Sequence, residues 1–133
     1  MTHAAAMLET TPSAPRYDPD PLARCIDSCF DCAQSCTACA DACLAEEMVS
    51  HLTRCISLNL TCADVCAATG FVLSRQVASD GPALPALLEA CAQACASCAE
   101  ECERHAEMHE HCRVCGEACR ACEEACRRLL DGD

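Results

Sequence analysis

The residues with the clearest chemistry in this sequence are its cysteines, which number 18 among 133 residues. They recur at alternating intervals of three and four residues, the spacing of one stripe along an α-helix. Thiols therefore occupy positions where an ordinary helical bundle carries leucine. They form four ladders, and we expect every member to bind metal: Cys25, Cys29, Cys32, Cys36, Cys39 and Cys43; Cys55, Cys62 and Cys66; Cys91, Cys95, Cys98 and Cys102; Cys112, Cys115, Cys119, Cys122 and Cys126.

The same spacing argues against disulfides within a ladder. Residues three or four apart on a helix have Cβ atoms about 5–6 Å apart, whereas a disulfide needs about 3.5–4.5 Å. Neighbouring cysteines of one ladder therefore cannot be bridged without breaking the helix.

The pairs separated by three residues suit a soft metal ion. A linear sulfur–metal–sulfur unit spans about 4.5 Å, which two thiolates one helical turn apart can reach. Cu(I) accepts such ligation, whereas Zn(II) and iron–sulfur clusters require four ligands, usually presented on loops or in motifs absent here. Charge favours the same ion, because one Cu(I) per thiolate cancels the buried negative charge, and an equal number of divalent ions would overshoot.

Composition restricts the remaining function classes. The length suits one domain, and the net charge of −12, with nine arginines and no lysine, disfavours nucleic-acid binding. By the sequence, no stretch is expected to reach the roughly 20 apolar residues of a membrane span, so no membrane role is expected. The N-terminus lacks the basic and apolar regions of a signal peptide. So many thiols without export indicate a reducing, cytoplasmic location.

The predicted fold is all-α, an antiparallel up-down-up-down four-helix bundle with a cysteine-lined core. Residues 1–20 are expected to be a mobile tail, because they contain three prolines and no periodicity. Residues 21–131 form the bundle, with helices at about 21–45, 47–77, 84–105 and 108–130. Asp20-Pro21 is a good helix start, and Ser79-Asp80-Gly81-Pro82 is a strong turn signal.

The break between the last two helices is a choice between alternatives, because no Gly or Pro lies between Cys102 and Cys112. One helix over 84–130 would be about 70 Å long and would leave half its thiols without facing partners. A break near 105–109 lets all four ladders meet, and we adopt it.

This topology gathers the non-cysteine ligand types at one end of the bundle, which we interpret as the mouth for metal. His105 and His109 continue a cysteine stripe and are predicted ligands. Auxiliary ligands are sought among five further residues, Met48, His51, Asn59, Met108 and His111, of which Asn59 stands where its ladder calls for a cysteine. The opposite end is predicted to be closed by leucines: Leu22, Leu73, Leu87, Leu88 and Leu129.

Rival functions remain open at this stage. A thiol-rich redox buffer could form disulfides between facing helices, and the same core could store Zn, Cd or Ag. Redox catalysis through Cys-x-x-Cys pairs would need a thioredoxin-like βαβ context, and no strands are evident. We therefore expect no enzyme activity.

The sequence resembles the bacterial four-helix-bundle copper storage proteins, specifically their cytosolic branch that lacks a leader peptide. The resemblance covers about residues 22–130 and rests on Cys-x-x-x-Cys pairs in all four predicted helices, on Cys29-Phe30-Asp31-Cys32-Ala33-Gln34, and on the run from Cys102 through His105 and His109-Glu110-His111 to Cys112. It implies a homotetramer of bundles, many Cu(I) ions bound mainly by cysteine, and an uptake end with His or Met ligands. Exchange with copper chaperones would follow from such a role.

Overall fold

The computed structural model describes residues 1–132, and within them the chain is helical, with no strand. The elements, in order, are α1 (His3–Thr10), α2 (Pro19–Leu44), the short 3-10 helix η1 (Val49–His51), α3 (Thr53–Leu73), α4 (Ala83–His105) and α5 (Glu110–Asp131). The predicted all-α class is confirmed.

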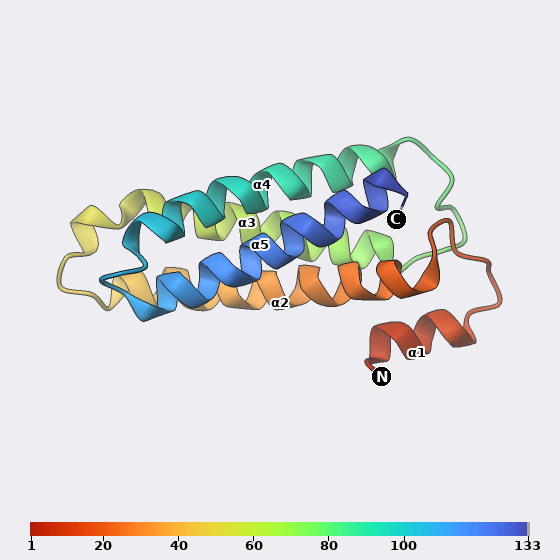
Figure 1. Ribbon diagram of the computed structural model, residues 1–133, viewed down its shortest axis with the longest axis horizontal. Helices are drawn as coiled ribbons and strands as arrows, with labels where there is room; N and C mark the ends of the chain where they lie inside the picture. The colour runs from red at the N-terminus through yellow and green to blue at the C-terminus, as the bar shows by residue number, and fades with distance from the viewer. Residues whose placement is uncertain (133) are drawn as a thin grey trace.

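Four long helices lie alongside one another and build the core (Figure 1). Helix α2 packs against α3 and α5, and α4 packs against the same two helices. The turns at residues 45–52 and 106–109 lie at one end of this assembly, on the left in Figure 1. We call it the histidine end, because four of the five histidines occur there or in the adjoining helix termini.

Helices α2, α4 and α5 have boundaries close to the predicted ones. Helix α2 begins at Pro19 after Asp18, two residues before the predicted start, because the chain carries two Asp-Pro pairs in succession. Helix α4 ends at His105, and the extended backbone of His109 precedes α5. The interruption therefore falls where the sequence analysis placed it, although the segment contains neither Gly nor Pro.

Helix α3 is shorter than the predicted 47–77. It begins at Thr53, because residues 45–52 form turns and η1 rather than a helical start at the two glutamates. It ends at Leu73, where side chains satisfy the last carbonyl groups. Ser74 Oγ donates to the Gly70 carbonyl at 2.7 Å, and Gln76 Nε2 donates to the Leu73 carbonyl at 2.7 Å.

The N-terminal segment departs from the expected tail without regular structure. Residues 3–10 form α1, which packs against α2 (Figure 1). Its start is capped by Thr2, whose hydroxyl accepts from the backbone N–H of Ala5, and three consecutive alanines favour the helix. The prolines that suggested an irregular arm begin only at position 12.

The core combines a long thiol section with a hydrocarbon section. All 18 cysteines are buried. The buried leucines near the start of α2 and α4 and the end of α3 and α5 are Leu22, Leu73, Leu84, Leu88 and Leu129, and we call their end of the assembly the leucine end. Leu84 is buried there, whereas the predicted Leu87 is only half-buried.

One expectation about hydropathy was wrong. Helix α3 is long and apolar enough to cross a membrane, with a mean hydropathy of 1.5 over its most apolar window. Hydropathy scales count cysteine as apolar, and this helix carries three. Length and composition are weak grounds for a span when a single helix meets them, because core helices meet them too. Here α3 packs between α2 and α4.

Candidate metal centre

The thiols of the four long helices meet in one buried column. Sulfurs of facing helices touch, with Sγ–Sγ distances of 3.5 Å for Cys36–Cys119 and 3.5 Å for Cys66–Cys95. Within a ladder, Cys32 and Cys36 lie 3.8 Å apart. A metal ion that links two such sulfurs therefore requires small side-chain rotations and no movement of the helices.

The sulfurs gather in overlapping groups of four. In each group the ligand atoms all lie within 4.8 Å of one another, and the thiol-only groups include Cys29/Cys91/Cys122/Cys126, Cys32/Cys66/Cys95/Cys122, Cys32/Cys36/Cys62/Cys119 and Cys36/Cys98/Cys115/Cys119. Four cysteines, Cys32, Cys36, Cys119 and Cys122, each belong to two of these groups. A shared sulfur can bridge two ions, so the arrangement suits many adjacent ions better than a few isolated sites.

Burial favours the neutral form of the Cys43 thiol, the last of the α2 ladder. Desolvation, together with the nearby Cys55 thiol, raises the pKa of Cys43 from its ordinary 9.0 to about 11. This thiol is therefore neutral at pH 7 when no metal is bound, and the binding of a metal must displace its proton.

Asn59 is fully buried among the thiols, at the position in α3 where the ladder calls for cysteine. Its Oδ1 accepts from the thiols of Cys98 at 3.0 Å and Cys115 at 3.1 Å, and its Nδ2 donates to Cys55 at 3.5 Å. The amide thus contacts α4, α5 and its own helix, and its polar atoms are satisfied.

His111 is the histidine that the structure brings to the thiols. Its Nδ1 lies 3.4 Å from Cys39 Sγ and 3.7 Å from Cys112 Sγ. These three residues and Cys43 form a further group of four ligand atoms within 4.8 Å. From the sequence, His111 is only an auxiliary candidate, because the helical stripe indicates His105 and His109 instead.

Carboxylates bind His105 and His109, the two histidines predicted as ligands. His105 Nε2 lies 2.9 Å from Glu101 Oε2, and His109 Nδ1 lies 2.6 Å from Glu46 Oε2. The same Glu46 oxygen accepts from His111 Nε2 at 3.0 Å, and this hydrogen bond is the main cause that keeps the pKa of Glu46 below its usual range. Glu46 thus joins both histidines of the α5 start.

Neither carboxylate is among the site residues predicted from the sequence. Glu101 lies four residues before His105, a helical spacing at which side chains meet, so that pair could have been found. Glu46 had been interpreted as a helix-start residue, and its 65-residue separation from His111 left no local signal.

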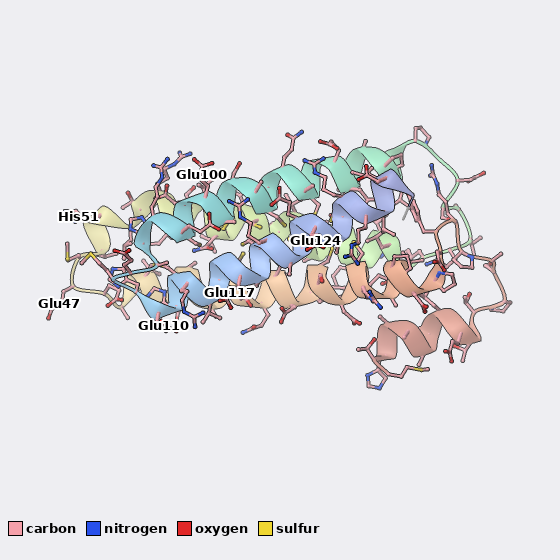
Figure 2. The ribbon with its side chains drawn as sticks, in the orientation of Figure 1. Glu47, His51, Glu100, Glu110, Glu117 and Glu124 are labelled. Atoms are coloured by element: carbon pink, nitrogen blue, oxygen red, sulfur yellow. The ribbon has the colours of Figure 1, made fainter. Side chains whose placement is uncertain are left out.

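The remaining candidates lie on the outside of the histidine end. His51 is exposed, and Figure 2 shows it at the same end of the molecule as Glu47. Met48 is 42% exposed and Met108 is 70% exposed. These exposed side chains lie outside the buried column.

The sequence profile of the copper storage proteins matches residues 18–131. A copper storage protein from Streptomyces lividans, solved with 10 copper equivalents, is 54% identical, with a TM-score of 0.94 over 98% of this chain and 99% of that one. Metal-free copper storage protein 3 from Bacillus subtilis is 36% identical, with a TM-score of 0.68 over 80% of this chain and 96% of that one.

A cysteine-rich Bacillus subtilis protein, described as uncharacterized, is 37% identical over 91 residues, which cover 68% of this chain and 79% of that protein. The profile match spans the four long helices and all 18 cysteines. The chain therefore belongs to the copper storage protein family.

Proposed function

We propose that this protein stores Cu(I) in the cytosol, holding many cuprous ions on cysteine thiolates inside an antiparallel up-down-up-down four-helix bundle. The observation that carries the proposal is the buried column of 18 thiols in overlapping groups of four. Soft thiolate ligands select Cu(I), and shared sulfurs allow ions to be packed closely. The solved relative from Streptomyces lividans, loaded with 10 copper equivalents, adds support.

Charge explains how the same core exists empty and full. Without metal, neutral thiols pack as small apolar side chains. Each Cu(I) that replaces one thiol proton leaves the net charge of the core unchanged. Loading can therefore continue through the column without the cost of buried unpaired charge.

The proposed ligands are all 18 cysteines, with His111 as the histidine best placed to share an ion with them. Copper enters at the histidine end, because buried leucines close the other end of the column. His105 and His109 remain in the proposal as uptake residues held by Glu101 and Glu46. Met48, Met108 and His51 provide neutral or borderline donors outside the column, and Asn59 provides an amide oxygen within it.

Several wider assignments belong to the same proposal. Residues 21–131 act as one storage domain, to which α1 is an added helix, and the protein catalyses no reaction. It works in the cytoplasm, without membrane or nucleic-acid partners, and exchanges copper with chaperone proteins. The exposed Leu60 and Phe71 on α3 suit contact with further copies of the chain in a homotetramer.

Anaerobic titration of the reduced, metal-free protein with Cu(I), followed by elemental analysis, tests the function. We expect loading on the order of one Cu(I) per cysteine, because bridging sulfurs serve more than one ion. Saturation at one or two ions per chain would refute storage. Loading near one ion per two cysteines would show isolated pairs and refute the bridging arrangement.

The uptake route has its own test. Replacing both His105 and His109 by alanine should slow copper uptake and chelator-driven release far more than it lowers final capacity. Normal rates in that double variant, with altered rates when the leucine end is changed, would place the mouth at the other end.

A further inference from the structure

The ligand group at the histidine end differs in kind from the groups inside the column. It consists of Cys39, Cys43, Cys112 and His111, and we call it the mouth site. The groups described above within the column offer four sulfurs, whereas the mouth site offers three sulfurs and one imidazole nitrogen. Three cysteines and one histidine form a donor set that holds tetrahedral Zn²⁺ in proteins.

The spacing of these atoms also fits that ion. Bond lengths of about 2.3 Å to sulfur and about 2.0–2.1 Å to nitrogen place tetrahedral ligands roughly 3.5–3.8 Å apart. In the structure, Cys39 Sγ lies 3.4 Å from His111 Nδ1 and 3.9 Å from Cys112 Sγ, and Cys112 Sγ lies 3.7 Å from the same nitrogen. Cys43 Sγ completes the set within 4.8 Å.

The surroundings prepare His111 as a ligand. Glu46 is ionised near neutral pH and accepts a hydrogen bond, so His111 Nε2 carries the ring proton and Nδ1 presents its lone pair to the thiols. A carboxylate behind a ligating histidine is the usual support in zinc sites. Cys112 lies in the first turn of α5, directly after His111 in the chain.

The net charge of a divalent ion together with its ligands differs between the mouth site and the interior of the column. Zn²⁺ with four thiolates leaves a net charge of −2, which is costly in a column that solvent does not reach. At the mouth site, three thiolates and a neutral imidazole leave −1, and the His111 side chain is 27% exposed. A divalent ion is therefore held at the entrance and does not pass inward.

We propose that the mouth site binds one Zn²⁺ per chain and that bound zinc obstructs the loading of Cu(I). The second half of this inference rests on the proposed function, because it takes the histidine end as the route of copper. Zinc would thus regulate access to the store rather than fill it.

The first experiment measures binding to the reduced, metal-free full chain without copper. Titration with Co²⁺ should give the absorption of a tetrahedral thiolate complex, saturating at one equivalent per chain and lost on addition of Zn²⁺. His111→Ala and Glu46→Gln should each lower Zn²⁺ affinity by about 10–100-fold. His3→Ala is the matched control, because His3 is an exposed histidine on α1, and it should bind Zn²⁺ normally.

The absence of tetrahedral Co²⁺ absorption, or unchanged Zn²⁺ affinity in His111→Ala, would overturn the zinc site. A stoichiometry of several equivalent ions would overturn it as well, since zinc would then occupy the column. The second experiment compares Cu(I) uptake by the same protein with and without one equivalent of Zn²⁺, and we expect at least tenfold slower uptake with zinc. An unchanged rate would overturn the obstruction.

Cu(I) titration of the zinc-free protein keeps this inference separate from the proposed function. Full copper capacity together with absent zinc binding would remove the zinc site and leave storage intact. One zinc per chain with no copper uptake would remove storage and leave the zinc site, without its regulatory role.

Discussion

Leu88 offers a sharp test of how the metal-free protein stays folded. Its side chain is fully buried at the leucine end, in the same core cluster as Leu22, Leu84 and Leu129. Leu88→Ala removes three carbon atoms, which at about 0.8 kcal/mol per buried carbon gives about 2.4 kcal/mol. The cavity left behind adds to this loss, so the free energy of unfolding should fall by about 3–4 kcal/mol.

The assay is urea unfolding of the reduced, metal-free protein, followed by far-UV circular dichroism. Val77→Ala is the matched control, because Val77 lies between α3 and α4 with 90% of its surface exposed. It should change the free energy of unfolding by less than about 1 kcal/mol. A loss below about 1 kcal/mol for Leu88→Ala would refute the view that the leucines carry much of the stability of the empty protein.

The same variant bears on the copper route. If copper passes through the histidine end, Leu88→Ala should load and release Cu(I) at the normal rate while it remains folded. Faster release to a chelator would show that the leucine end is a barrier to copper and that opening it creates a route.

Three further predictions concern the fold and its response to pH. Gly70→Ala should lower the free energy of unfolding, measured with urea, by about 1–3 kcal/mol, because the added Cβ would lie 2.8 Å from Phe30 Cζ. Gly81→Ala is the control, because a Cβ at that position has no atom within 4 Å, and it should have no such effect. The pKa of the Cys43 thiol is raised to about 11 in the folded protein, so this thiol ionises at a lower pH in the unfolded chain than in the folded one. The metal-free protein should therefore lose stability as pH rises from about 9 to 11, and stability that rises over this range would contradict the assignment. Arg16 donates to the carbonyls of Ser79 at 2.9 Å and Gly81 at 2.7 Å, so Arg16→Ala should speed amide hydrogen exchange around residues 11–18, and unchanged exchange would show that this contact does not hold the segment.

The regular spacing of the cysteines made it possible to predict from the sequence which residues form the core. A 3.5-residue repeat identifies one face of a helix, and every thiol on that face is buried in the structure. The break near His105 followed from the need of the last ladders for facing partners. Helix α1 was missed because the prolines after it dominated the interpretation of a segment whose first ten residues favour a helix.

The candidate site was predictable only in part, because its chemistry depends on contacts between distant segments. The stripe of α4 pointed to His105, yet Glu101 occupies that ring, and the thiols are met by His111 from the next helix. Glu46 reaches His111 across 65 residues, and only the arrangement of the chain brings them together. Periodicity describes one helix at a time, whereas a site of this kind is assembled from several.

The buried amide of Asn59 solves a problem of alignment that the thiol ladders create. A ladder that repeats every seven residues looks the same after a shift of seven, so one helix could slide along its neighbours and still place sulfur against sulfur. In the observed alignment the Asn59 oxygen accepts from thiols on both α4 and α5, which ties α3 to its two neighbours. A single buried asparagine fixes the register of coiled coils in this way. We expect Asn59 to select one alignment among near-equivalent ones, so that Asn59→Cys would fold into a mixture of registers.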